Sequence, residues 1–90
     1  MGKDQRKHIR FEADPNTLVL LEFKNGQVVT GLALQEAFKG VGAIFIAHEL
    51  IEKNTKAKIQ VGELGPMDCT IRWVRALTDK VFEVGFEYDN

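Results

Sequence analysis

Residues 17–34 read TLVLLEFKNGQVVTGLAL, two apolar runs rich in β-branched residues on either side of Asn25-Gly26. Asparagine and glycine both accept the positive φ of a type I′ turn, so the stretch predicts a β-hairpin. Its two strands are expected over 17–23 and 27–34. The first half of the chain is therefore expected to hold two neighbouring antiparallel strands.

Four more segments beyond the hairpin have the patterns of strands. They are AIFIA (43–47), AKIQV (57–61), CTIRW (69–73) and VFEVGFEY (81–88). The last three alternate apolar and polar residues, as half-buried strands do, whereas AIFIA is apolar on both faces and is expected to be fully buried. In this phase Cys69, Ile71 and Trp73 share one face, which predicts that Trp73 is a core residue.

The segments between these strands are short. FKGVG (38–42) predicts a glycine-rich break, GELGP (62–66) predicts a loop, and 48–56 is too short for more than a turn or two of helix. Parallel strands need crossovers of a dozen or more residues, so the links impose antiparallel pairing. Six twisted strands that must hide their edges are expected to close into a small barrel filled by side chains.

The predicted fold is therefore all-β: a small six-stranded antiparallel β-barrel with a flexible basic N-terminal arm and little helix. The arm is expected over 1–12 and the single barrel domain over 13–90. Because side chains fill a barrel of this size, any binding site is expected on its rim or its outer face.

Composition excludes several classes of function. The 90 residues are 44% hydrophobic and carry a net charge of −1. This net charge argues against non-specific electrostatic binding to DNA or RNA. The only cysteine, Cys69, rules out an internal disulfide framework. No apolar run is long enough for a membrane helix, and the first residues lack the apolar centre of a signal peptide. A cytoplasmic protein without membrane insertion is expected.

An enzyme is not expected. Cys69 is predicted to face the core, and His8 and His48 are the only histidines available as a base. His48 with Glu49 and Glu52 is better explained as a solvated turn than as a metal site. The chain has no Ser/His/Asp arrangement and no phosphate-binding loop, so no catalytic residue, metal or cofactor is predicted.

The basic leader is the strongest candidate for binding. Residues 1–10 hold four basic residues and one acid, a net charge of +3. Arginine presents a planar set of donors that matches phosphate oxygens and the O6/N7 edge of guanine. Arg6 and Arg10 would lie about 13 Å apart in an extended chain. That spacing suits a ligand with several separated anionic and purine groups.

The layout resembles the PilZ domain, the bacterial receptor module for cyclic di-GMP. RKHIR (6–10) is similar to the family's RxxxR motif ahead of the first strand, and IRWVRAL (71–77) with VFEVGFEY is similar to its last two strands. The second motif, (D/N)xSxxG, matches 35–40 incompletely. Gln35 stands at the acid or amide position, Ala37 at the serine position, and Gly40 agrees with the pattern.

The resemblance implies that Arg6 and Arg10 clamp phosphates and guanine edges, and that Gln35, Ala37 and Gly40 shape a guanine pocket. Lys7 and Lys39 are further candidates. The expected function is a cyclic di-GMP receptor or adaptor whose arm and surface change on binding, so that it regulates an unidentified partner protein.

Two alternatives remain. In the first, Gln35 and Ala37 replace the usual motif residues and ligand binding is lost. The chain is then an adaptor that acts by protein–protein contact, for which an exposed Trp73 would be a sign. In the second, it is an OB-like barrel for single-stranded nucleic acid. The inward phase of most aromatic residues and the acidic body disfavour the OB-like barrel.

Overall fold

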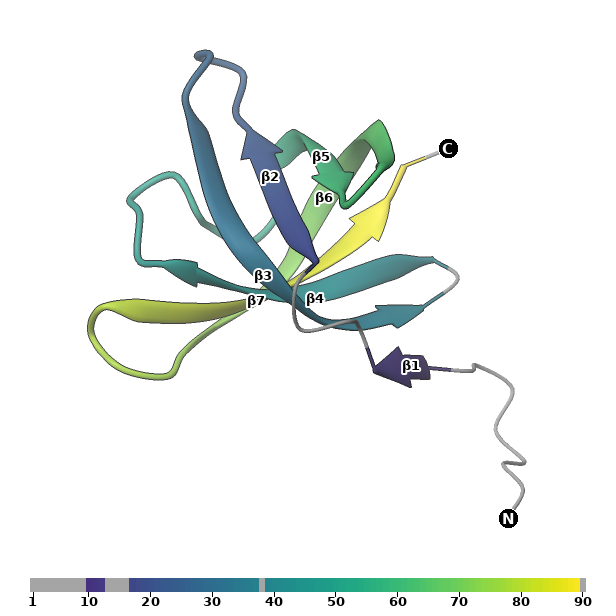
Figure 1. Ribbon diagram of the computed structural model, residues 1–90. Helices are drawn as coiled ribbons and strands as arrows, with labels where there is room; N and C mark the ends of the chain where they lie inside the picture. The colour runs from purple at the N-terminus through teal and green to yellow at the C-terminus, as the bar shows by residue number, and fades with distance from the viewer. Residues whose placement is uncertain (1–9, 13–16, 38, 90) are drawn as a thin grey trace, which may run out of the picture.

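The computed structural model describes residues 10–12, 17–37 and 39–89 (Figure 1). Seven strands lie within them. They are β1 (Arg10–Glu12), β2 (Leu18–Glu22), β3 (Val28–Ala37), β4 (Gly40–Ile46), β5 (Lys56–Val61), β6 (Leu64–Ala76) and β7 (Val81–Tyr88). The described residues contain no helix, and hence none that could span a membrane.

Strands β2 to β7 form a closed antiparallel barrel. Each strand pairs with two others in the order β2–β3–β4–β7–β6–β5, and β5 pairs with β2 to complete the ring. The prediction of an all-β, six-stranded antiparallel barrel is confirmed. The additional short strand β1 pairs with the last three residues of β3, where β2 no longer covers that strand (Figure 1).

The predicted hairpin is β2–β3, but the turn type was wrong. The N–H of Phe23 donates to the carbonyl of Gln27 at 2.9 Å, and the N–H of Gly26 donates to the carbonyl of Phe23 at 2.9 Å. Only Gly26 has a positive φ in this turn, at 91°, so the loop is a type I turn followed by a left-handed glycine. Asn25 stays in the ordinary region, with its Oδ1 accepting the N–H of Gln27.

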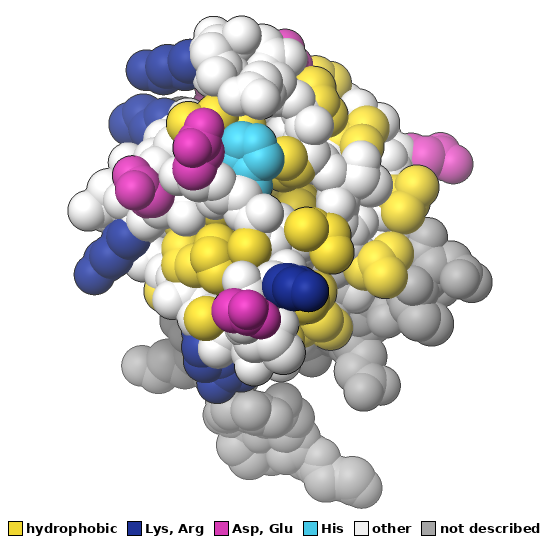
Figure 2. Space-filling model, turned by 90° about the vertical axis from the view of Figure 1, so that its left-hand side faces the viewer, with side chains coloured by type: hydrophobic (Ala, Val, Ile, Leu, Met, Phe, Trp, Pro, Cys, Tyr) yellow, Lys and Arg dark blue, Asp and Glu magenta, His cyan; other side chains and the backbone are white. Residues whose placement is uncertain are grey.

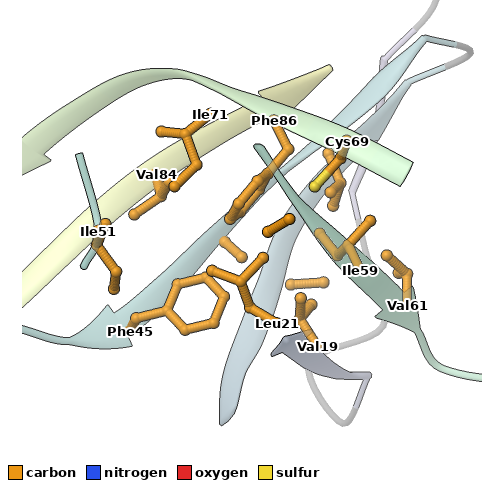
Figure 3. Close-up of a cluster of buried hydrophobic side chains, with 14 of the residues drawn as sticks. Val19, Leu21, Phe45, Ile51, Ile59, Val61, Cys69, Ile71, Val84 and Phe86 are labelled. Atoms are coloured by element: carbon orange, nitrogen blue, oxygen red, sulfur yellow. The ribbon is translucent and has the colours of Figure 1, made fainter. Parts of the chain in front are cut away.

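The barrel interior is filled by alternate residues of all six strands (Figure 3). Val19, Leu21 and Phe23 of the hairpin are buried, and so are Ala57, Ile59 and Val61, the apolar positions of the alternating segment 57–61. Phe45 and Phe86 meet edge to face in the centre, with ring centroids 5.8 Å apart. Cys69 is fully buried, and burial, reinforced by Asp89 and Asp68, raises its pKa to about 12. The thiol is therefore a buried packing group of the core, as predicted.

Three predictions about the strands were wrong. The segment 43–47 is not buried on both faces, because Ile46 is 71% exposed. The break expected over 38–42 is largely strand: Gly40 and Gly42 belong to β4. A Cβ on Gly40 would lie 2.0 Å from the carbonyl oxygen of Phe86, so the missing side chain permits close pairing with β7. The loop expected over 62–66 is shorter, since β6 already begins at Leu64.

The placement of Trp73 in the core was also wrong. Its side chain is 44% exposed, although Cys69 and Ile71 on the same strand are fully buried. The pairing of β6 with β7 shifts by one residue between Ile71 and Trp73, so Arg72 is an extra residue in the ladder. This β-bulge breaks the alternation and turns Trp73 to the outer face.

Candidate functional site

One cross-strand row on the outer face of the barrel brings together residues of four strands. Gln35 of β3 is opposite Gly42 of β4, Gly42 is opposite Gly85 of β7, and Gly85 is opposite Trp73 of β6. Directly opposed residues of antiparallel strands share a face of the sheet. Gln35 and Trp73 therefore stand on either side of two glycines, on main chains roughly 14 Å apart.

Both side chains are turned outward by a bulge. The β3–β4 register shifts between Ala33 and Gln35, and the β6–β7 register shifts between Ile71 and Trp73. Strict alternation would place Gln35 on the same face as Ala33, which is 4% exposed and belongs to the core. Bulges are frequent beside functional sites because they re-aim single side chains.

The two glycines have different surroundings. A Cβ on Gly85 would lie 2.2 Å from Cε2 and Nε1 of Trp73, so the indole occupies the place of a side chain there. A Cβ on Gly42 would meet only the carbonyl oxygen of Val84, at 4.0 Å. The space above Gly42 is therefore open, with the indole on one side and Gln35 on the other. We call this space the Gly42 slot.

The slot belongs to a surface pocket of about 240 Å³, which Lys39, Gly40 and Arg72 also line. The row two residues further along the strands runs from Arg10 through Ala37 and Gly40 to Glu87. The main chain of Arg10 thus lies beside the segment 35–40. Register alone brings four of the sequence-predicted residues to one end of the barrel: Arg10, Gln35, Ala37 and Gly40. Arg6 and Lys7 lie outside the described residues.

The charges around the pocket are of both signs. The guanidinium of Arg72 donates from Nε and from one terminal nitrogen to Oε1 of Glu87, both at 2.6 Å. Lys39 is exposed and forms no ion pair within 17–37 and 39–89.

The carboxylate of Glu36 belongs to the other face of β3. Glu36 is opposite Val41, which is buried in the core, so the register places it on the other face from Gln35, and it still contributes to the lining of the pocket. Tyr88 lies nearby: burial raises its pKa, and the charge of Glu36 raises it further.

Sequence reasoning missed Gly42, Arg72, Trp73 and Gly85 as site residues. A signal for one of them was present, because a glycine inside the alternating strand VFEVGFEY marks a close approach by another group. Among the described residues no cluster of three metal-ligating side chains exists. The site is a small open surface with an aromatic face, a glycine floor, an amide and charged side chains of both signs.

Comparison with known proteins gave matches in structure only. No protein-family model and no curated protein sequence matches the chain. The PilZ domain with c-di-GMP of YcgR from Escherichia coli superposes with a TM-score of 0.77 at 12% identity, over 97% of this chain and 79% of that one. The longer YcgR chain in complex with c-di-GMP gives 0.73 at 18% identity. MrkH of K. pneumonia in its apo state gives 0.71 at 14% identity.

The chain spans most of that isolated domain, but 38% of the longer YcgR chain and 43% of the MrkH chain. The superpositions cover 96% of this chain or more, which leaves no strand of the barrel outside the likeness. Together with the ring of six strands, they show that this chain has the fold of a PilZ domain.

Proposed function

We propose that the chain is a cyclic di-GMP receptor that binds its ligand on the outer face of the barrel, across the Gly42 slot. One observation carries the proposal: the register brings the main chain of Arg10, Gln35 and Gly40 together beside an exposed tryptophan. Structures of YcgR and MrkH with this fold contain c-di-GMP, which supports the choice of ligand.

Each part of the site has a role in this proposal. A purine stacks on the indole of Trp73 above Gly42, and the amide of Gln35 meets the edge of the base. The open space above Gly42 lets the ligand approach the main chain closely. Gly40 lines the pocket and permits the close pairing of β4 with β7, and Ala37 opposite it adds no polar group. Arg6 and Arg10 bind phosphates and the O6/N7 edge of guanine, with Lys7 and Lys39 as additional cations.

Binding would order the basic arm against the barrel and so change the surface that the protein presents. A segment that orders through charge-assisted hydrogen bonds is a common switch. The proposed output is therefore the regulation of a partner protein in the cytoplasm, without a chemical step in this chain.

The test is calorimetric titration of the protein with cyclic di-GMP. Arg6→Ala and Arg10→Ala should each weaken binding by about 10-fold to 100-fold, since hydrogen bonds to charged groups contribute about 1.5–3 kcal/mol. Arg75→Ala is the matched control, because it removes the same charge from β6 at a residue paired with Glu83 outside the pocket. Binding that is equally strong in all three variants contradicts the proposal.

A ligand-independent adaptor is the second candidate, and the exposure of Trp73 and the apolar outer face of β2 to β4 favour it. Leu18 is opposite Leu32, and Leu32 is opposite Ile44, so one apolar row crosses three strands. The exposed large hydrophobic residues of this face are Leu18, Leu20, Val28, Leu32, Leu34 and Ile46. Figure 2 shows hydrophobic side chains over the right-hand half of the face it presents, with most charged side chains to the left.

Exposed apolar patches of this kind mark protein contacts. The adaptor function is preferred to the receptor function if the wild type gives no heat of binding with cyclic di-GMP at millimolar concentration while a partner protein still binds. In that case Leu32→Glu should abolish partner binding and Leu77→Glu, at an equally exposed leucine in the β6–β7 loop, should not.

A further inference from the structure

The outward side chains of β2, β3 and β4 form one apolar face, which we call the β2–β4 face. Its large hydrophobic side chains have exposed fractions from 36% to 71% and are Leu18, Leu20, Val28, Leu32, Leu34 and Ile46. In one row Leu18 is opposite Leu32 and Leu32 is opposite Ile44, and in the neighbouring outward row Leu20 is opposite Thr30. Among the residues that the structure describes, neither row holds a charge on these three strands.

We infer that the β2–β4 face is the contact surface of a homodimer, in which Leu32 lies on the two-fold axis and meets its own copy. The partner on this face is thus a second copy of this chain. The inference goes beyond the receptor function, since it requires no ligand. It also gives the face a different occupant from the one in the adaptor function.

The apolar area of the face is close to that of half a homodimer interface. The exposed fractions of its six side chains add up to about three whole residues, or roughly 400 Å² of apolar surface at about 30 Å² for each carbon group. A standard interface buries about 800 Å² on each partner, of which about 65% is apolar in homodimers, or roughly 500 Å². The face therefore supplies most of the apolar area that a stable dimer needs, before its rim is counted.

The face is also compatible with its own copy in charge. A two-fold symmetric contact brings the same patch of both chains together, so charges of one sign in its middle would repel each other. Here the charges lie at the borders, and each border has both signs. On the β5 side Glu22 is opposite Lys58, and on the β7 side Glu83, opposite Ile44, forms an ion pair with Arg75. Either border can therefore meet either border of the second copy with opposite charges in reach.

Leu32 is the middle of the β2–β4 face. It lies on the central strand of the three, between Leu18 and Ile44 across the sheet, with Thr30 and Leu34 before and after it on β3. The centre of a two-fold symmetric interface lies on the axis, where a residue meets its own copy. Sheets that pack face to face are about 10 Å apart, so the two main chains at position 32 are expected at about that distance.

The first experiment is analytical ultracentrifugation of the wild type, Leu32→Glu and Leu77→Glu. We expect the wild type to sediment with twice the mass of one chain at micromolar concentration and to dissociate on dilution. Leu32→Glu places two like charges on the axis and should weaken self-association by about 100-fold or more. Leu77→Glu is the matched control, because Leu77 is 46% exposed and Leu32 is 47% exposed, and Leu77 lies between β6 and β7. It should dimerise like the wild type.

The second experiment tests the position of the axis by cross-linking. Cys69 is the only cysteine of the chain and is fully buried, so Leu32→Cys adds a single accessible thiol. A bifunctional maleimide about 10 Å long should join two copies of Leu32→Cys, since that length matches the spacing of stacked sheets. It should not join two copies of Leu77→Cys at the same protein concentration.

The inference is overturned if the wild type is still a monomer at hundreds of micromolar concentration, which would leave the β2–β4 face free for a different protein. It is also overturned if Leu32→Glu dimerises as strongly as the wild type, or if Leu32→Cys is cross-linked no better than Leu77→Cys. A dimer then forms through another surface. The titrations with cyclic di-GMP test the receptor function separately, because the homodimer requires no ligand.

Discussion

Gly42 and Gly85 occupy neighbouring places in one cross-strand row, yet a methyl group would do different things at the two positions. At Gly85 it would lie 2.2 Å from the indole of Trp73, and at Gly42 it would enter open space. Gly85→Ala should therefore displace Trp73, lower the free energy of unfolding and weaken ligand binding. Gly42→Ala should leave stability unchanged or slightly raised, because alanine restricts the unfolded chain.

A methyl group at position 42 should nevertheless weaken ligand binding. An overpacked methyl costs about 1–3 kcal/mol, so Gly42→Ala should weaken cyclic di-GMP binding by roughly tenfold or more. Trp73 is the only tryptophan in the chain, so its fluorescence reports both the displacement and the titration. If Gly42→Ala binds like the wild type, the base does not lie in the Gly42 slot.

The residues of the site differ in how far the sequence could predict them. Gln35, Ala37 and Gly40 were proposed because they stand at fixed spacing in a motif, and the register places their main chains at one end of the barrel. Trp73 was assigned to the core because period-2 alternation from Cys69 and Ile71 requires it. A bulge adds one residue without any change in composition, so a pattern of apolar and polar residues does not reveal it.

At the scale of elements, β6 and β7 present a pair of opposite charges beside the pocket. Glu87 lies opposite Gly40, and Arg72 is held to it by an ion pair between half-exposed side chains. A dinucleotide with two phosphates is repelled by Glu87 and attracted by Arg72. Glu87→Gln should thus tighten binding by a few-fold, and Arg72→Ala should weaken it by a similar factor.

A purely structural ion pair would behave differently. Both substitutions would then lower stability together, by no more than about 1 kcal/mol for an exposed pair, and neither would change affinity. Titrations at low and high salt complete the test, since the opposite effects of the two variants should shrink as screening increases. If both substitutions change the affinity for cyclic di-GMP in the same direction, this ion pair is not part of the binding site.

The strands themselves were predictable, and their ends were less so. The sequence pattern located every strand of the barrel, through alternation for β5 to β7 and through apolar runs for β2 to β4. It failed at Gly40 and Leu64, where glycine and proline nearby indicated breaks and the backbone continued as strand. Tertiary pairing decided these places: Gly40 meets Glu87 of β7, and Leu64 meets Val61 of β5.

At the scale of the whole molecule, the candidate site and the core depend on the same ring of strands. Phe45 is 1% exposed in the barrel centre, and the next residue, Ile46, is 71% exposed. Phe45→Ala should lower the free energy of unfolding by about 3–5 kcal/mol, whereas Ile46→Ala should change it by about 0.5 kcal/mol or less. Chemical denaturation of both variants measures the difference.

The site spans β3, β4, β7 and β6, so a ligand there should stabilise the whole barrel and not a single loop. A ligand that binds only the folded state adds about 2.7 kcal/mol at a concentration one hundred times its dissociation constant. Cyclic di-GMP should therefore restore a large part of the stability that Phe45→Ala removes, with one cooperative transition. If the ligand binds Phe45→Ala but leaves its unfolding midpoint unchanged, binding does not require the closed barrel, and a site built from cross-strand register is wrong.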